Sequence, residues 1–298
     1  MKNTAFNLPA NRPCTMILDT DTYNEIDDQF ALLYALFSPA DIRLIGVTAA
    51  PFDNKRSEGY ADGMERSYQE ICRILEMTGK SGEVPAFRGS TTRLPDRSTP
   101  VDSEAVDFII AQAEACAARG EKLILCAIGA ITNVASALLK APELKDQIIV
   151  VWLGGHVMSA TDPREFNLQG DITASQVLFA SGVPLLQIPC CGVASKLETT
   201  LRALRKDLPA DQVGSYLIEI FDDYMDHKED APKVIWDISA IAAVLRPEIF
   251  KWEIVPAPIL TDDCTWQGEA AHCIKRATDL DVQEIFGDLF EKINKNAF

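Results

Sequence analysis

Apolar stretches long enough for buried strands alternate with segments of helical periodicity over the first two-thirds of the sequence. Strands are predicted over residues 15–20, 42–49, 84–87, 122–128, 147–153 and 183–188, and helices over 27–37, 60–78, 103–119 and 132–140. The apolar runs are of the kind found in parallel sheets, whose strands are covered on both faces. This alternation predicts an α/β fold, with a Rossmann-like open, mostly parallel sheet flanked by helices.

The last third of the chain is predicted to be mainly helical over residues 200–245, with its clearest helices at 216–228 and 234–245. Short strands at 251–255 and 259–260 and a polar helix at 282–293 complete the prediction. Because no linker or shift of composition marks a boundary, we expect one domain spanning residues 1–298.

The charge and the hydropathy pattern exclude several classes of partner. A formal net charge of −16 without clusters of Lys and Arg does not suit DNA, RNA or an anionic membrane, and favours a small neutral or cationic ligand. No apolar run approaches the roughly 20 residues of a membrane span, and the N-terminus lacks the apolar core of a signal peptide, so a cytoplasmic protein is expected. The eight cysteines show no CxxC spacing and are predicted to be reduced.

Four aspartates follow or end the first predicted strand within ten residues: Asp19, Asp21, Asp27 and Asp28. Helix capping explains one or two acidic residues at a helix start, but not four around one turn. Such a cluster repels itself unless a positive charge lies in it. The absence of His and Cys from the stretch predicts a hard, oxygen-liganded cation, Ca²⁺ or Mg²⁺.

Ligands of open α/β sheets bind beyond the carboxyl ends of the strands. Polar residues gather after several of the predicted strands, which makes them candidate contacts of a substrate. They are Asp53 and Asn54 after the second strand, residues 129–133 after the fourth, and His156 with residues 161–167 after the fifth.

Asp237 interrupts an otherwise apolar segment, VIWDISAIAAVL. A carboxylate flanked by Trp236 and Ile238 is costly to bury without a partner. A metal ion shared with the first aspartate cluster would offset that cost. A buried salt bridge or a helix N-cap is the alternative role.

Four segments, in the same order, resemble motifs of the inosine-uridine preferring nucleoside hydrolases. ILDTDTYNEIDD is similar to the amino-terminal DTDPGxDD motif, AITNVASAL to LTNxA, PREFN to PxxEFN, and IWDISAIA to HDPxA. The resemblance implies a nucleoside hydrolase fold with a Rossmann-like core and a homodimer or homotetramer. It also implies hydrolysis of the N-glycosidic bond of ribonucleosides at a tightly held Ca²⁺, in purine or pyrimidine salvage.

The resemblance assigns the metal site residue by residue. Asp21 corresponds to a ligand that also deprotonates the attacking water, and Asp28 to a bidentate ligand. Thr132 would offer its backbone carbonyl, and Asp237 would complete the protein ligands. Ca²⁺ is the expected ion, with Mg²⁺ as the alternative.

The resemblance also assigns the contacts of the sugar. Asp27 corresponds to the carboxylate that binds the ribose hydroxyls, and Glu165 and Asn167 to the pair that grips the sugar, including its 5′ end. The residue types agree with this chemistry, because carboxylates and amide oxygens stabilise the positive charge of an oxocarbenium-like transition state.

The sequence departs from the family motifs at two places near the proposed site. Five residues, TYNEI, separate Asp21 from Asp27 where the motif has three, so Asn24 or Glu25 is expected to enter the pocket. The family's asparagine near the EFN segment has no clear match, and Ser159 or Thr161 falls in its place. We expect these changes to alter the nucleobase preference.

The group that protonates the leaving base is the third departure. The family often has a histidine just before the last metal aspartate, and this position is Trp236, which would stack on the base or fill the core. Tyr224 and His227, three residues apart on a predicted helix, would share a face and reach the leaving group, with a solvated surface as the alternative. His156, after a predicted strand, is the best-placed histidine, with a structural hydrogen bond as its alternative role.

Two other functions fit parts of the pattern. A nucleoside or sugar binding protein on the same scaffold would keep the ion and lack turnover. ILDTDT also resembles the DxDx(T/V) motif of haloacid dehalogenase-type phosphatases, in which Asp19 would be the nucleophile. The phosphatase alternative does not predict Asp27, Asp28 or the EFN segment.

Overall fold

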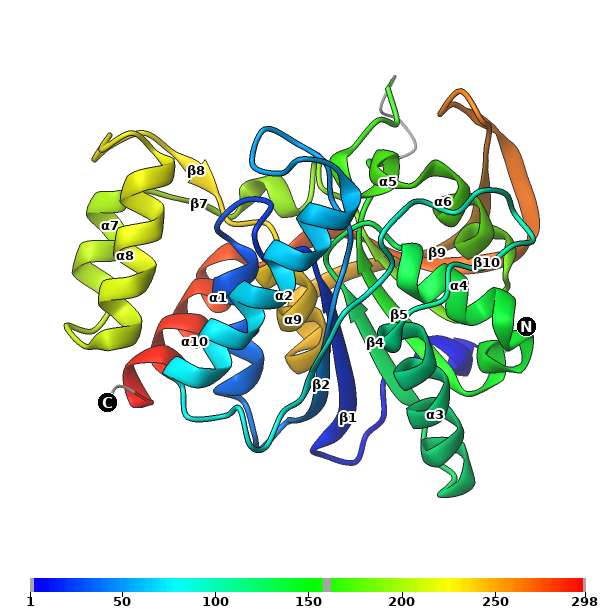
Figure 1. Ribbon diagram of the computed structural model, residues 1–298, viewed down its shortest axis with the longest axis horizontal. Coiled ribbons are helices and arrows are strands. Elements are labelled where there is room, and N and C mark those ends of the chain that lie inside the picture. Colours follow the sequence, from blue (N-terminus) through cyan, green and yellow to red (C-terminus); the bar gives the residue numbers. More distant parts are fainter. Residues whose placement is uncertain (1–2, 158–161, 297–298) are drawn as a thin grey trace.

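An eight-stranded sheet runs through the molecule in the computed structural model, which describes residues 3–157 and 162–296 (Figure 1). The strand order is β3-β2-β1-β4-β5-β6-β10-β9, and all neighbours are parallel except β10 and β9. The strands are β1 (Cys14–Thr20), β2 (Ile42–Ala49), β3 (Ala86–Phe87), β4 (Leu123–Ala127), β5 (Ile148–Leu153), β6 (Leu185–Ile188), β9 (Phe250–Leu260) and β10 (Trp266–Leu280). The predicted open, mostly parallel sheet is confirmed.

Helices cover both faces of this sheet. On one side lie α1 (Asp28–Leu36), α2 (Tyr60–Met77), α9 (Ile238–Leu245) and α10 (Val282–Lys295). On the other side lie α3 (Glu104–Ala118), α4 (Thr132–Lys140) and α6 (Ile172–Ala180), preceded by the short α5 (Phe166–Gly170). Two further helices, α7 (Leu201–Asp207) and α8 (Gln212–Tyr224), pack beside a small antiparallel sheet of β7 (Glu198–Thr199) and β8 (Lys233–Val234).

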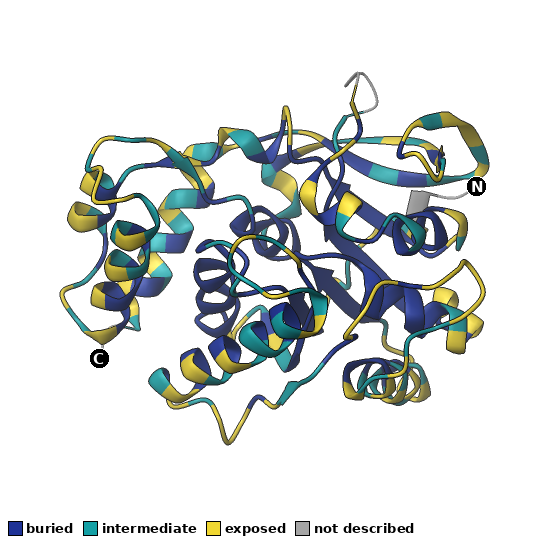
Figure 2. Ribbon diagram, turned by 45° about the horizontal axis from the view of Figure 1, so that its top comes forward, coloured by how far each residue is buried: buried dark blue, intermediate teal, exposed yellow. Residues whose placement is uncertain are grey.

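The sheet separates two apolar cores, because successive side chains of a strand point to opposite faces. In β1, Leu18 joins the core under α1 and α9, whereas Ile17 joins the core under α3 and α4. All residues of β1, β4 and β5 are buried, and the buried centre is flanked by exposed helix surfaces in Figure 2. This explains why these strands appear in the sequence as continuous apolar runs.

The chain order reverses between β1 and β4. From β1 the chain proceeds outward through β2 and β3 on one side, and later through β4, β5 and β6 on the other. The segments that follow β1 and β4 therefore leave the same sheet edge in opposite directions, which opens a crevice between them. The aspartate cluster follows β1 and residues 129–133 follow β4, so the fold brings both to this crevice.

Most predicted elements are present within a few residues of their expected bounds, and Ser103 caps α3 as its sequence position suggests. Four differences are larger. Helices α5 and α6 were not predicted. The long strand β10 was not predicted, because its polar residues hide a strand that pairs with β9 and β6. The helix expected at 216–228 starts earlier, at Gln212, because Asp211 caps it. The helix expected at 234–245 begins at Ile238, because Val234 belongs to β8 and residues 235–237 connect that strand to the helix.

All eight cysteines are unpaired in this structure, as predicted. None of the helices in the described part of the chain combines the length and the apolar character that a bilayer crossing requires.

A buried carboxylate joins the two sides of the crevice. Asp171 accepts hydrogen bonds from the backbone N–H of Ala174, where it caps α6, from the N–H of Leu94 and from the hydroxyl of Thr132, at 2.8–2.9 Å. Asp171→Ala leaves these donors unsatisfied, so we expect the free energy of unfolding to fall by about 2–4 kcal/mol. Urea denaturation measures this, with Asp146→Ala, at an exposed site, as the control. A change equal to that of the control would contradict this assignment.

Candidate active site

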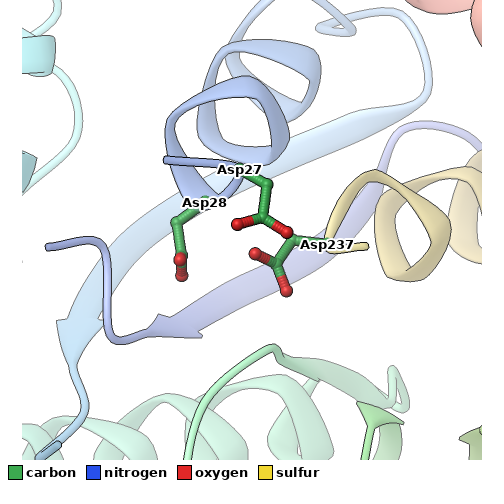
Figure 3. A group of neighbouring side chains, drawn as sticks. All are labelled: Asp27, Asp28 and Asp237. Carbon is green, nitrogen blue, oxygen red and sulfur yellow. The ribbon is translucent and has the colours of Figure 1, made fainter. Parts of the chain in front are cut away.

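Three carboxylates converge at the crevice (Figure 3). Asp27 and Asp28 lie at the start of α1, and Asp237 lies at the start of α9. One oxygen atom of each lies within 4.8 Å of an oxygen of the others, and all three residues are buried. This arrangement requires positive charge or bound protons, because three ionised carboxylates at such distances repel one another strongly.

Asp21 lies beside this group and has no hydrogen-bond partner for either carboxylate oxygen, although both are buried. Gly129 packs against this side chain, and a Cβ atom at that position would lie 3.0 Å from the Asp21 carboxyl group. A buried acceptor without donors is rare in native proteins and indicates that a partner such as an ion or a water molecule binds there. The two orphaned oxygens therefore fit a cation held jointly with the neighbouring aspartates.

Hydroxyl and amide groups donate hydrogen bonds to Asp28 and to Asp19. Thr20 donates a hydrogen bond of 2.5 Å to Asp28. Thr48 and Asn133 donate bonds of 2.6 and 2.8 Å to the same oxygen of Asp19. These bonds fix Asp19 Oδ1, whereas its buried Oδ2 has no hydrogen-bond partner, and the absence of Asp19 from the predicted ligand set stays a prediction.

Burial dominates the electrostatics of the cluster. It raises the pKa of Asp28 to about 7, with the nearby Asp27 as the second cause. Burial and then Asp28 raise the pKa of Asp21, and burial and then Asp27 raise that of Asp237. For Asp27 burial raises the pKa, while the positive charge of Lys233 opposes the shift. Without a cation, the site stays folded only by retaining protons.

A cavity of about 360 Å³ opens above the carboxylates, a size suited to a small ligand. Most of the residues predicted from the sequence line it: Asp21, Asn24, Glu25, Asp27, Asp28, Asn54, His156, Glu165, Asn167, Trp236 and Asp237. Five further residues complete the lining: Ile128, Leu153, Arg164, Phe166 and Cys190.

Three residues that were assigned a role in the site do not line this cavity, and neither do Asp53 and residues 129–133 among the other candidate contacts. Thr132 is the first residue of α4 and is fully buried, and its hydroxyl donates to Asp171. Tyr224 approaches from the outer side, where its hydroxyl donates to Glu25. The prediction that His227 shares a helical face with Tyr224 is wrong, because α8 ends at Tyr224 and His227 has a φ of 59°. Its exposed ring bonds Asp222.

The α5 end of the cavity is held by backbone contacts. Glu165 caps α5 by accepting from the N–H groups of Asn167 and Leu168, and it also accepts from that of Gly155 at 2.7 Å. The amide nitrogen of Asn167 donates to the carbonyls of Ile128 and Leu153 at 3.0 Å. These bonds fix the Asn167 side chain and leave its oxygen as an acceptor.

The lining residues that were not predicted carried partial signals in the sequence. Arg164 and Phe166 flank Glu165 in PREFN and could have been found by adjacency. Cys190 lies two residues after the end of β6, at the same sheet edge, and its thiol faces Glu165. The predicted replacements Ser159 and Thr161 lie outside the described residues.

Comparison with known sequences agrees with this site. The profile described as inosine-uridine preferring nucleoside hydrolase matches residues 16–287, which include the aspartate cluster, the EFN segment and Asp237. The chain belongs to this family. Membership confirms the predicted resemblance and the prediction of an N-glycosyl hydrolase, and it disfavours the phosphatase alternative.

Individual relatives are distant but cover most of the chain. The non-specific ribonucleoside hydrolase RihC of Shigella boydii is 26% identical, over 90% of this chain and 94% of its own length. An uncharacterized protein of Schizosaccharomyces pombe, C1683.06c, is 26% identical over 83% of this chain and 84% of its own.

Solved structures share the fold. An inosine-guanosine nucleoside hydrolase matches with a TM-score of 0.77 and 17% identity, covering 95% of this chain and 99% of the other. The plant nucleoside hydrolase PpNRh1 matches with a TM-score of 0.73 and 21% identity, covering 94% and 99%. The nucleoside hydrolase fold predicted from the sequence is thereby confirmed.

The raised carboxyl pKa values predict how stability depends on pH and Ca²⁺. Between the ordinary pKa of 3.8 and the folded value of about 7 for Asp28, the ion-free folded state binds more protons than the unfolded chain. Its stability therefore decreases as pH rises through this window. We expect added Ca²⁺ to raise the melting temperature of chelator-treated protein more at neutral pH than at about pH 5.

Differential scanning calorimetry over this pH range measures the effect. Asp237→Asn removes one carboxylate and serves as the matched variant, with a shallower pH dependence and a smaller shift on adding Ca²⁺. An ion-free protein whose stability rises between about pH 5 and 7 would show that the carboxylates are not held at raised pKa values.

Proposed function

We propose that this protein hydrolyses the N-glycosidic bond of ribonucleosides, releasing ribose and the free base, with Ca²⁺ held by the carboxylates at the crevice. The observation that carries the proposal is the convergence of the buried carboxylates of Asp27, Asp28 and Asp237, with Asp21 beside them, whose two oxygens have no hydrogen-bond donor. Membership of the family and the names of relatives such as the ribonucleoside hydrolase RihC support the substrate class.

The donor set suits a hard divalent cation. Asp21, Asp28 and Asp237 would hold the ion with carboxylate oxygens, and Thr132 would add its backbone carbonyl, consistent with Ca²⁺ or, as the alternative, Mg²⁺. When bound, the ion offsets the repulsion among the carboxylates and makes a water molecule in the site easier to deprotonate.

Asp21 is the proposed general base. Its two oxygens line the cavity and accept no hydrogen bond from the protein, so one of them is available to take a proton from the attacking water. Asp27 uses one oxygen to accept from the backbone N–H of Trp236 at 2.8 Å, which leaves the other for the ribose hydroxyls. Asp27 thus orients the sugar while Asp21 activates its attacker.

The opposite end of the cavity would hold the rest of the sugar. The side-chain oxygen of Asn167 is left as an acceptor for a hydroxyl group, because its nitrogen is used by two carbonyls. Glu165 accepts from three backbone N–H groups and faces the Cys190 thiol, so it chiefly fixes the start of α5 at the sugar end. The carboxylates that line the cavity would stabilise the positive charge of the oxocarbenium-like transition state.

The leaving base would lie near Trp236. This side chain is half-buried and lines the cavity, so its ring offers a stacking surface rather than a proton. The His156 ring accepts at Nδ1 from the backbone N–H of Cys191, at 3.2 Å, which places the hydrogen of a neutral ring on Nε2. His156 can therefore donate a proton at Nε2, but it follows β5, as Asn167 does, and so would serve a group at that end of the cavity.

A homodimer or homotetramer, a cytoplasmic location and a role in nucleoside salvage belong to the same proposal. Light scattering of the purified protein after size exclusion gives the number of subunits directly.

Turnover of a panel of ribonucleosides tests the reaction. We expect release of reducing sugar from at least one of them, lost on chelation and restored by Ca²⁺. No release from any nucleoside in the presence of Ca²⁺ would favour a binding protein without turnover.

Replacing the proposed base tests its role. Asp21→Ala should lower kcat by about 10²–10⁴-fold, the range typical of a general base, and weaken Ca²⁺ binding as well. Calorimetric titration with Ca²⁺ and a reducing-sugar assay measure both effects, and Asp146→Ala, at an exposed site, is the control. Unchanged activity and ion affinity would remove Asp21 from the site.

A further inference from the structure

The carboxylate of Glu25 forms part of the cavity wall and is held by two groups from a distant part of the chain. The hydroxyl of Tyr224, at the end of α8, donates to Oε1 at 2.8 Å. The ammonium group of Lys233, on β8, contacts Oε2 at 2.7 Å. The Lys233 side chain is 11% exposed, whereas that of Glu25 is 33% exposed. Tyr224 and Lys233 thus fix the Glu25 carboxylate, and its remaining surface lines the cavity.

The rest of the loop 22–26 is equally well fixed. The Asn54 amide donates to the Asn24 side chain at 2.5 Å. Arg56 donates to the backbone carbonyl of Tyr23 at 3.0 Å and lies over its ring, 4.6 Å from the centroid. These contacts come from the segment after β2. The loop therefore presents Glu25 in a defined position before any ligand arrives, which reduces the entropic cost of binding.

Sheet order places Glu25 at one end of the cavity. Residues after β1 and β2 line this end, whereas Asn167, which follows β5, lines the other. Trp236 belongs to the same end, because its backbone N–H donates to Asp27, which follows Glu25 by two residues. A riboside whose sugar contacts Asn167 would direct its heterocycle toward Glu25 and Trp236.

The cavity is strongly acidic. Six carboxylates line it, while Arg164 is the one cationic side chain among the described lining residues. Arg164 is paired with Asp162 at 2.8 Å. Glu25 has about four acceptor positions and uses two of them on Tyr224 and Lys233. Its remaining lone pairs can interact with a ligand, and the surrounding negative potential favours a positive one.

We infer that Glu25 is the specificity-determining residue at the leaving-group end and favours ribosides with a positively charged heterocycle over neutral ones. This inference rests on the proposed function. A cationic heterocycle also suits a site with Trp236 at this end. When its C1′–N bond breaks, the electron pair goes to nitrogen and the base departs neutral without a proton donor. Water supplies the hydroxyl to C1′, and its proton goes to Asp21.

A matched pair of substrates tests the inference. 7-Methylguanosine carries a positive imidazolium ring at mildly acidic pH, and guanosine is its neutral counterpart. The ratio of their kcat/KM values is measured for the wild type and for Glu25→Gln, so the greater intrinsic reactivity of the methylated compound cancels. We expect Glu25→Gln to lower this ratio about tenfold, chiefly through the KM of the cation.

Two further variants separate charge from loop structure. Tyr224→Phe removes a hydrogen bond to Glu25 but keeps its charge, so the ratio should be retained even if both KM values rise. Glu143→Gln, at an exposed site on the 3₁₀ helix Pro142–Asp146, changes the net charge equally and should leave the ratio unchanged. A ratio that is the same in Glu25→Gln and the wild type, or a fall as large in Tyr224→Phe, would overturn the inference.

Binding measurements keep this test independent of turnover. Dissociation constants of both nucleosides are determined by calorimetry with Ca²⁺ present, for wild type and Glu25→Gln. A selective loss of affinity for the cation supports the role of Glu25 even if neither compound is cleaved. Absence of cleavage of every riboside would count against the proposed function alone, and equal losses for both ligands would count against Glu25 alone.

Discussion

The mutual repulsion of buried carboxylates is the constraint on which the rest of this structure depends. Burial is the main cause that raises the pKa values of Asp21 and Asp237, and the nearby charge of Asp28 adds to the first shift and that of Asp27 to the second. The starts of α1 and α9 point their partial positive charge at the group. That contribution is small beside the cost of burying several charges, so the scaffold has to be rigid enough to keep them together until a cation binds.

The parallel part of the fold was predictable because its physics is local. Strands covered on both faces must be apolar throughout, so β1, β4 and β5 stand out in the sequence. The strand β10 was not predictable in the same way. Its outer half pairs only with β9, and residues such as Lys275 and Arg276 conceal a strand whose partners lie on β6 and β9. The pairing, and not the composition, defines that element.

The site shows the same division. The acidic residues and the EFN segment are visible in the sequence because the chemistry needs those residue types close to strand ends. The partners of Glu25 were not predictable, because Lys233 lies 208 residues away and belongs to a two-residue strand. The misplacement of His227 followed from extending α8 beyond Tyr224, although Met225 is its C-cap and both Asp226 and His227 have positive φ. Contacts between distant segments thus account for what the sequence could not reveal.

The attachment of the loop 22–26 has a consequence for engineering and for divergence between relatives. Transplanting the loop 22–26 alone would be of little use. Its Glu25 would lack Tyr224 and Lys233, and its Tyr23 would lack Arg56. A graft into a shorter-looped relative would need a piece from each of three regions of the chain. The loop 22–26 and the residues that hold it should therefore vary together among relatives. A substitution in one of them should be tolerated only when the others change as well.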